Sequence, residues 1–322
     1  MKTCGFLRNQ INFEPTGIQP CCDVRALGVP SFPFSGGPLR LDGYVGHIAD
    51  VLTRVQTGSD HCAGCPELRD DGKPFDLPTA ETFRIAAVSV NHHRYFCNCK
   101  CSYCDLWAAS GKKPPYAILP ALESLAEQGA LSPQCVISWG GGEPGLLREF
   151  PAVCRWGMEK GIVQYVHTNA LLCSPAVTEL LAAGKGLVNI SLDSGDAATY
   201  RKVKGVDGWD AVMASLQTYT AACRAPEQID LKYIIFDDTN DIAQVEKFFQ
   251  VCLRFGIRKI QYSLNFKEIN RRAVSPKTLI AAAFFKARAT ELGLDAESFY
   301  IDPPMAARIK AYEAELFTRE TR

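Results

Sequence analysis

From about residue 83 onward, short apolar runs rich in β-branched and aromatic residues alternate with segments long enough for helices. Six runs follow one another: FRIAAVSV (83–90), CVISW (135–139), IVQYVH (162–167), LVNISL (187–192), IDLKYIIF (229–236) and IRKIQYSL (257–264). Strands joined by helix-length connections form parallel sheets with right-handed crossovers. We therefore predict an α/β fold, most simply a partial (β/α)6 barrel, with an open doubly wound sheet as the alternative.

Residues 1–80 have a different character. They are rich in proline and glycine (EPTGIQP, GVPSFPFSGGP), and only GHIADVLTRVQ has the spacing of a helix. A segment of this kind buries little core unaided and is commonly stabilised by a metal. The sequence thus predicts a small loop-rich, cysteine-rich domain at 1–80, a barrel at 81–268 and a helical extension at 269–322.

The charge balance and the apolar runs exclude some classes of partner. Lys+Arg and Asp+Glu are equal at 35 each, so no strong field is available to gather nucleic acid or anionic lipid. No apolar run reaches the length of a membrane span, and MKTCGFLRNQ lacks the apolar core of a secretory signal. We expect a cytoplasmic protein that binds neither nucleic acid nor membranes.

The chain has 14 cysteines, and in a reducing compartment their clusters are more often metal ligands than disulfides. One cluster is CNCKCSYC, with the spacing Cys97-x3-Cys101-x2-Cys104, on the loop after the first predicted strand. A closed structural zinc site needs four protein ligands. Three thiolates with one position open predict a metal or cluster that also holds a substrate, and Cys99 is left as a spare thiol.

A second motif, WGGGEPG at 139–145, follows the second predicted strand. Glycines there let the backbone approach a ligand closely, Glu143 adds an acceptor and Pro144 fixes the turn. The alternative is a simple tight turn between a strand and a helix. The chain has no Walker A sequence or GxGxxG, so nothing indicates nucleotide phosphate binding.

Together these motifs resemble the radical S-adenosylmethionine (SAM) superfamily. The resemblance rests on the cysteine spacing, with an aromatic residue before the last cysteine, and on GGEP at 141–144. Further matches follow in order: HTNA at 167–170, SLDS at 191–194 and DAATYRKVKG at 196–205. It covers about residues 83–265.

The resemblance implies a role for each matched residue. Cys97, Cys101 and Cys104 would bind three irons of a [4Fe–4S] cluster, and the fourth iron would bind the amino and carboxylate groups of SAM. The implied SAM-binding residues are Tyr103, Gly141, Gly142, Glu143, Asn169, Ser191, Asp193 and Lys204. Lys204 would meet the SAM carboxylate, where related enzymes often have an arginine, although a lysine lacks the bidentate fork.

The implied chemistry is radical chemistry. A low-potential cluster, reduced by a donor such as flavodoxin or ferredoxin, would pass one electron to SAM. This would release methionine and a 5′-deoxyadenosyl radical, which takes a hydrogen atom from an unactivated substrate carbon. The site must then keep water and oxygen away from this radical.

The N-terminal cysteines resemble the SPASM and twitch modules that hold auxiliary [4Fe–4S] clusters in many radical SAM enzymes. Cys4, Cys22, Cys62 and Cys65 would be the four ligands, and Cys21 is the rival to Cys22. Such modules normally follow the barrel, whereas these cysteines precede it. The alternative is a structural zinc site.

An auxiliary cluster would exchange an electron with the substrate radical, which favours oxidation or dehydrogenation of a small or carbohydrate-like molecule. Epimerisation would instead need a hydrogen-atom donor, for which Cys223 is a candidate thiol. The alternative substrate is a short peptide, modified by a thioether, a carbon–carbon bond or epimerisation. Two other classes remain: a cluster-binding sensor without turnover, and a zinc-stabilised nucleic-acid binder.

Overall fold

The computed structural model describes most of the chain: residues 2–4, 6–21, 29–57, 62, 65, 68–70, 77–109, 115–271 and 273–320. The chain divides into two units. The first unit contains residues 1–96 and 110–165, and the second contains residues 97–109 and 166–322. The boundary at residue 165 falls inside strand β7 (Val163–Thr168).

The first unit is built on a mostly parallel group of strands. Its strands are β2 (Gln10–Glu14), β3 (Gly17–Gln19), β5 (Ile85–Val90) and β6 (Leu131–Trp139). β2 and β6 pair with β5 in parallel, and β3 pairs with β2 in antiparallel orientation. A separate antiparallel pair joins β1 (Lys2–Cys4) to β4 (Leu68–Asp70).

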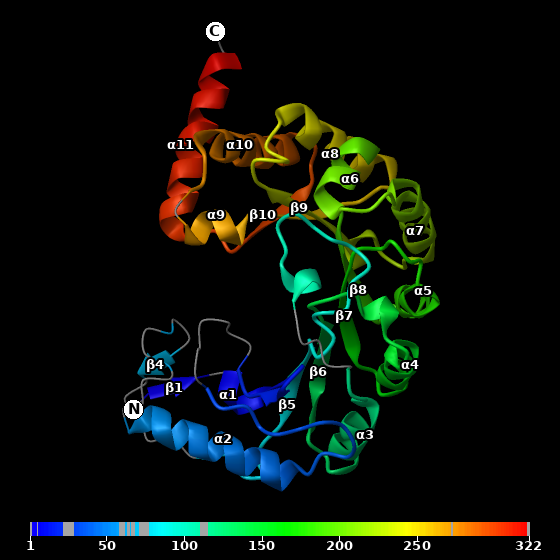
Figure 1. Cartoon of the computed structure of the whole chain (residues 1–322), viewed down its shortest axis with the longest axis vertical. Coiled ribbons are helices and arrows are strands. Elements are labelled where there is room, and N and C mark those ends of the chain that lie inside the picture. The colour runs from blue at the N-terminus through cyan, green and yellow to red at the C-terminus, as the bar shows by residue number, and fades with distance from the viewer. Residues whose placement is uncertain are drawn as a thin grey trace. The chain divides into compact units, whose positions relative to one another are not determined.

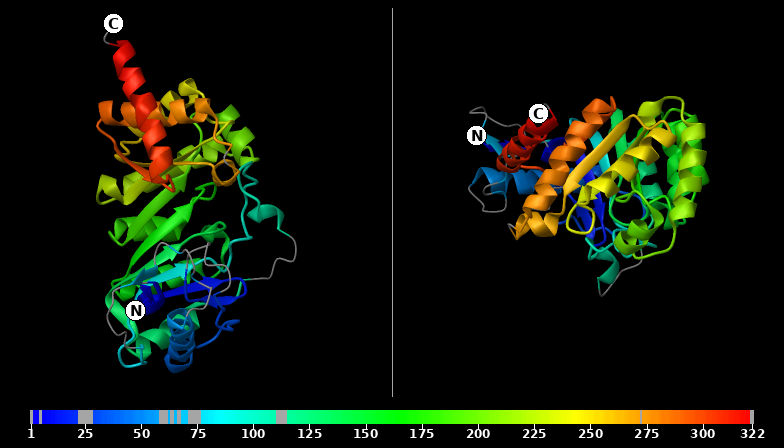
Figure 2. Two further views of the ribbon diagram at one scale, coloured as in Figure 1. Left: turned by 90° about the vertical axis from the view of Figure 1, so that its left-hand side faces the viewer. Right: turned by 90° about the horizontal axis from the view of Figure 1, so that it is seen from above.

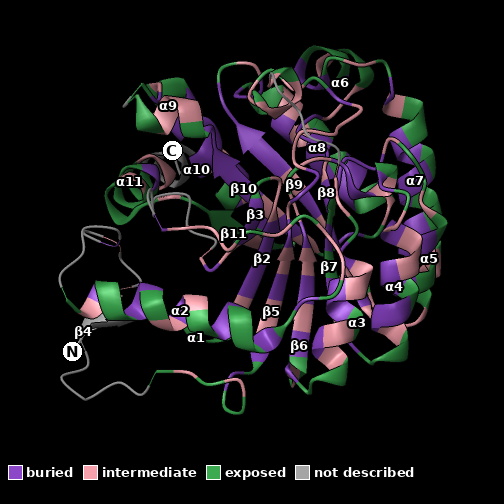
Figure 3. Cartoon of the chain, turned by 60° about the horizontal axis from the view of Figure 1, so that its bottom comes forward, coloured by how far each residue is buried: buried purple, intermediate pink, exposed green. Residues whose placement is uncertain are grey.

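The helices described in this unit are α1 (Phe6–Asn9), α2 (Leu41–Gln56), α3 (Leu119–Glu127) and α4 (Phe150–Glu159). In α2 the buried residues Tyr44, Ile48, Val51 and Val55 recur every three to four positions, which gives the helix one apolar face. In Figure 3 this helix alternates between buried and exposed colours along its length.

The second unit continues the α/β pattern. Strands β8 (Gly186–Ser191), β9 (Ile229–Ile235), β10 (Lys259–Leu264) and β11 (Asp295–Phe299) pair in parallel in that order. The first three are labelled in Figure 1. The helices are α5 (Pro175–Ala182), α6 (Ala197–Lys204), α7 (Trp209–Ala222), α8 (Ile242–Arg254), α9 (Phe266–Asn270), α10 (Pro276–Glu291) and α11 (Pro303–Glu320). Helices α10 and α11 lie side by side in both views of Figure 2.

Aromatic side chains fix helices α8 and α10 onto one face of this strand group. The ring centroid of Tyr233 on β9 lies 4.9 Å from that of Phe248 on α8. Tyr262 on β10 lies 5.1 Å from Phe285 on α10, measured in the same way. All four side chains are buried, so this face is the core of the second unit.

The predicted α/β fold is confirmed, and all six predicted strands are present as β5 to β10. Strands β1 to β4 and β11 were not expected. Because β2 pairs with β5, the first unit includes the N-terminal segment, and the predicted boundary at residue 80 is not a boundary between the two units. The three-domain division stays a prediction.

The segment predicted as a helical extension, residues 269–322, contains α10 and α11 but also strand β11. Among the helices in the described residues, none combines the length and the apolar character that crossing a membrane requires.

Candidate active site

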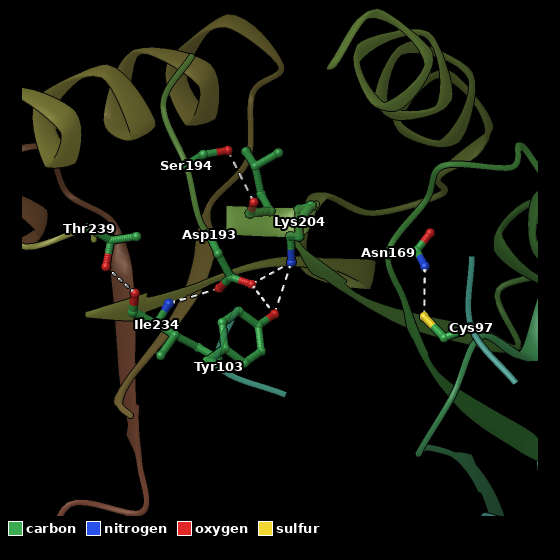
Figure 4. Close-up of polar contacts among 9 residues, drawn as sticks. Cys97, Tyr103, Asn169, Asp193, Ser194, Lys204, Ile234 and Thr239 are labelled. Atoms are coloured by element: carbon green, nitrogen blue, oxygen red, sulfur yellow. Dashed lines mark hydrogen bonds and ion pairs between the residues drawn. The ribbon is translucent and has the colours of Figure 1, made fainter. Parts of the chain in front are cut away.

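The loop that carries the three spaced cysteines belongs to the second unit. Cys97, Cys101 and Cys104 are half-buried, whereas Cys99 is buried. Two donors point at the Cys97 sulfur. The Cys99 backbone N–H lies 3.4 Å from Sγ, and Asn169 Nδ2, directly after β7, lies 3.6 Å from it (Figure 4). N–H groups directed at a ligating sulfur are a known means of tuning iron–sulfur sites.

The middle of the loop is hydrogen-bonded to the end of helix α6. The backbone N–H of Lys100 donates to the Lys204 carbonyl at 2.8 Å, and that of Ser102 donates to the Val203 carbonyl at 2.9 Å. Gly205 ends the helix with φ of +68°, and a Cβ there would lie 2.6 Å from the Lys100 carbonyl oxygen. A glycine is therefore required where the loop meets α6.

A buried polar triad joins the loop to β8 and α6. Tyr103 Oη donates to Asp193 Oδ2 at 2.7 Å, and Lys204 Nζ lies 2.5 Å from the same oxygen and 3.1 Å from Tyr103 Oη (Figure 4). The other carboxylate oxygen accepts the Ile234 backbone N–H at 2.8 Å. Asp193 and Lys204 are both buried, so their ion pair is shielded from water.

The electrostatics follow from this burial. Burial disfavours the charge of Lys204, but the Asp193 carboxylate outweighs it and raises the pKa of Lys204. Burial, helped by the negative charge of Asp193, raises the pKa of Tyr103, which keeps its hydroxyl a donor. The hydrogen bond from Cys99 and the charge of Lys204 lower the pKa of Cys101, although burial opposes them. A thiolate is the form that binds a metal.

The GGEP turn belongs to the first unit and is packed too tightly for side chains. A Cβ on Gly142 would lie 2.1 Å from the Phe96 carbonyl oxygen, and Gly141 has φ of +86°. The Glu143 backbone N–H donates to the Phe96 carbonyl at 2.7 Å. Phe96 directly precedes Cys97, so the turn is hydrogen-bonded to the residue just before the cysteine loop.

Glu143 is buried, and its Oε1 accepts the Gly145 backbone N–H at 3.1 Å, which stabilises the turn. Beside the turn lies a cavity of about 540 Å³. Its lining residues are Phe96, Pro115, Tyr116, Ala117, Leu146, Leu147, Arg148 and Glu149.

The residues of the loop fit an iron–sulfur cluster. Among the described residues, no three His, Cys, Asp or Glu side chains form a group that could hold a metal ion. In a cluster, by contrast, each thiolate binds a different iron, so the sulfurs need not converge on one point. The loop offers three soft sulfur ligands and N–H donors to one of them.

The other predicted SAM-binding residues also lie in the second unit. Asn169 is next to Cys97, and Ser191 is the half-buried last residue of β8. Asp193 and Lys204 are occupied by each other, so contact of Lys204 with a SAM carboxylate would compete with this ion pair.

In the N-terminal segment, four cysteines line one apolar pocket. Its lining residues are Cys4, Leu7, Cys21, Val29, Cys62, Cys65 and Leu68. Burial and the neighbouring Cys4 and Cys65 raise the pKa of the Cys62 thiol. The predicted ligand Cys22 lies outside the described residues, whereas its rival Cys21 lines the pocket.

Cys223, predicted as a hydrogen-atom donor, follows α7 and lies in a pocket with Ile229, the first residue of β9. It is therefore at the amino end of the strands. Asn169 and Asp193, in contrast, follow the carboxyl ends of β7 and β8. This position argues against the predicted role, which depended only on the chain order of a cysteine within an apolar segment.

Sequence reasoning missed a row of polar side chains on β8 to β11, including Lys232. The signal was present: Asp230 and Lys232 alternate with apolar residues in IDLKYIIF, which is the period of a strand with one polar face.

Comparison with known proteins identifies the central part of the chain. The model of the radical SAM superfamily matches residues 92–235. These residues form a radical SAM domain. Such a domain implies a [4Fe–4S] cluster and SAM, as the resemblance of the motifs implied.

The radical SAM domain has curated relatives of two kinds. A GTP 3′,8-cyclase of Mycolicibacterium smegmatis is 26% identical over 196 residues, which is 57% of this chain and 52% of the cyclase. Another, from Haemophilus influenzae, is 30% identical over 124 residues, which is 37% of each chain. The mycofactocin maturase MftC of Mycobacterium tuberculosis is 25% identical over 50% of this chain and 40% of its own. The chain thus spans about half or less of the length of these relatives.

Solved structures share the fold. Streptococcus suis SuiB bound to its precursor peptide SuiA aligns with a TM-score of 0.53 and 12% identity, over 98% of this chain and 75% of SuiB. The anSMEcpe structure with bound AdoMet aligns with a TM-score of 0.53 and 18% identity, over 67% of this chain and 64% of its own.

Proposed function

We propose that this protein is an enzyme that cleaves SAM reductively and abstracts a hydrogen atom from its substrate. The observation that carries the proposal is the cysteine loop within the radical SAM domain, with three thiols at the family spacing. When bound, the cluster and SAM supply a 5′-deoxyadenosyl radical, with the electron coming from a low-potential donor such as a flavodoxin or ferredoxin.

The side chains of this protein have distinct tasks in that reaction. Cys97, Cys101 and Cys104 would hold the cluster, and Asn169 donates to the Cys97 sulfur. Tyr103 fixes the loop through its bond to Asp193. The buried Glu143 and the glycines before it form a turn whose backbone can approach the amino group of SAM closely.

The test is anaerobic reconstitution with iron and sulfide, followed by dithionite and SAM, with 5′-deoxyadenosine as the measured product. Alanine at Cys97, Cys101 or Cys104 should abolish product formation, because an iron loses its thiolate. The matched control is Cys99→Ala in the same loop, which should retain most of the activity. If the control loses activity as completely as the others, the ligand assignment is wrong.

For the substrate, we propose oxidation or dehydrogenation of a small or carbohydrate-like molecule, with the electron leaving through an auxiliary cluster. Support for that cluster comes from the four cysteines that line one pocket, Cys4, Cys21, Cys62 and Cys65. Thiolates are the ligands that iron–sulfur clusters take. Zinc is the rival metal, since four thiolates also satisfy a closed zinc site.

Peptide modification is the second candidate. It is supported by the likeness of fold to SuiB, a protein solved with a precursor peptide, over 98% of this chain. MftC, a maturase by name, is a relative of the same domain. Incubation with SAM, reductant and either sugars or candidate peptides separates the two, because only the true substrate increases deoxyadenosine formation and changes mass.

A further inference from the structure

The side chain of Asn169 follows strand β7 and points at the cysteine loop (Figure 4). It is buried, and its amide nitrogen contacts two residues of the loop. Nδ2 is 2.7 Å from Asn98 Oδ1 and 3.6 Å from Cys97 Sγ. An asparagine amide nitrogen carries two N–H donors, so one is available for each of these acceptors. The amide of Asn169 therefore joins a residue between the cysteines to a cysteine sulfur.

The orientation of this amide is fixed from its other end. Asn169 Oδ1 accepts the Leu171 backbone N–H at 2.9 Å, so the oxygen faces its own turn and the nitrogen faces the sulfur. The turn has an uncommon shape, because Ala170 has a left-handed φ of 54°. The Ala170 N–H donates to Thr168 Oγ1 at 2.9 Å, which stabilises this shape. Two side-chain acceptors thus hold the turn in a conformation that directs the Asn169 amide at the loop.

This arrangement bears on the role of Asn169. The family resemblance implies a contact with SAM, but the N–H donors of Asn169 are directed at the loop and its oxygen is bonded to the turn. A ligand that took one of these donors would remove it from Asn98 or from the Cys97 sulfur. The amide is instead placed to act on the sulfur.

An N–H donor at a ligating sulfur changes how easily a cluster is reduced. Reduction adds negative charge, part of which falls on the thiolates, and an N–H dipole directed at a sulfur stabilises that charge. The Cys97 sulfur receives the Asn169 amide and also the Cys99 backbone N–H at 3.4 Å. Removal of the Asn169 donor should therefore make reduction less favourable.

We propose that Asn169 and Asn98 together set the reduction potential of the cluster. Asn169 donates to the Cys97 sulfur, and Asn98 is a positioning residue that holds the Asn169 amide in place. The proposal rests on the proposed function, because it needs a cluster bound by the loop. Its signature is a more negative potential, at unchanged iron content, when either side chain is replaced.

The first measurement is a redox titration of reconstituted, anaerobic protein, followed by electron paramagnetic resonance. The signal that changes when SAM is added belongs to the cluster of the cysteine loop, which separates it from an auxiliary cluster. Asn169→Leu keeps the size of the side chain and removes its donors. At a fixed potential, it should lower the ratio of reduced to oxidised cluster by about threefold to tenfold. A tenfold change corresponds to about 59 mV for a one-electron couple.

The matched control is Asn189→Leu, in strand β8 of the same unit. Asn189 is buried like Asn169, but its Nδ2 donates to Gln261 Oε1 at 2.9 Å and not to a sulfur. The potential of this variant should equal that of the wild type. The iron content of each variant should also be unchanged, because no ligand is removed.

Asn98→Leu tests the positioning role and is the milder change, because Asn98 is half-buried. It should shift the potential in the same direction by a smaller amount. In the Asn169→Leu background it should add no further shift, since Asn98 acts through Asn169. If Asn169→Leu does not take up iron, Asn98→Leu alone still decides between a shifted and an unchanged potential.

Unchanged potentials in Asn169→Leu and Asn98→Leu would overturn the proposal. Equilibrium dialysis then shows whether Asn169 contacts SAM instead, in which case Asn169→Leu weakens SAM binding at least about tenfold. The proposed function fails by a different observation, a wild-type protein that has no SAM-responsive signal and forms no deoxyadenosine.

Discussion

At the scale of single residues, the least expected feature is that Lys204 is a partner of Asp193 and Tyr103. Taking both charges out of water is costly, and the cost is offset only while the pair is intact. The spacing of the motifs predicted which residues lie near the cysteines. It could not predict this contact, because Asp193 reaches Lys204 from a left-handed backbone conformation, with φ of 54°, that sequence spacing does not reveal.

Lys204→Met tests the energetic role of the triad. The substitution leaves the buried Asp193 carboxylate without its cation, so the free energy of unfolding should fall by about 3–5 kcal/mol. The matched control is Lys202→Met, two residues earlier on α6, where the side chain is 64% exposed and pairs with Asp238. Its effect should stay below about 1 kcal/mol. Urea unfolding of the apoprotein measures both, and equal losses would contradict the account.

At the scale of helices and strands, the sequence predicted the elements that have a clear apolar pattern. The strands β5 to β10 carry long apolar runs, and each was expected. Strand β11, DAESF, is mostly exposed, so its sequence lacks the apolar residues by which a buried strand is predicted. It is a strand because it pairs with β10. Strand β2, QINFE, is buried but only five residues long within a proline-rich and glycine-rich segment.

Helix α6 shows how a local signal supports the site, since it carries Lys204. Asp196 caps its N-terminus, with Oδ1 accepting the Thr199 N–H at 2.9 Å and Oδ2 lying 2.6 Å from Lys247 Nζ. Asp196→Ala should therefore reduce the free energy of unfolding by about 1–2 kcal/mol at pH 7. The control is Asp207→Ala, whose carboxylate is 69% exposed and pairs with Arg201. Its effect should be within about 1 kcal/mol.

The pH dependence of the same variant has a definite sign. Burial raises the pKa of Asp196, but Lys247, the Thr199 N–H and Gln244 outweigh it and hold the pKa below the usual 3.8. A carboxyl whose pKa is lower in the folded than in the unfolded protein stabilises the fold fully when the pH is above its unfolded-state pKa. This stabilisation is lost as the pH falls through its folded-state pKa. The difference between wild type and Asp196→Ala should thus shrink below about pH 4, and a constant difference from pH 7 to pH 3 would refute it.

At the scale of the whole chain, the distribution of cysteines raises the question of how many metal centres it holds. The radical SAM match begins at residue 92, so the pocket lined by Cys4, Cys21, Cys62 and Cys65 lies outside it. The sequence predicted that these cysteines act together but left Cys21 and Cys22 as rivals. The two are adjacent, so their distances along the chain to the other cysteines differ by only one residue. The structure describes Cys21 in this pocket, whereas Cys22 lies outside the described residues.

Iron content tests this second centre directly. With two [4Fe–4S] clusters, reconstituted protein should contain about eight irons per chain, four for each cluster. The double variant Cys62→Ala with Cys65→Ala should lose about four irons and still form deoxyadenosine, because the cysteine loop is untouched. Cys21→Ala should lower the iron content similarly, and Cys22→Ala, its neighbour, should not. The reverse order would make Cys22 the ligand. About four irons with one zinc in the wild type would instead make the N-terminal centre a structural zinc site, and an electron from the substrate would then need another acceptor.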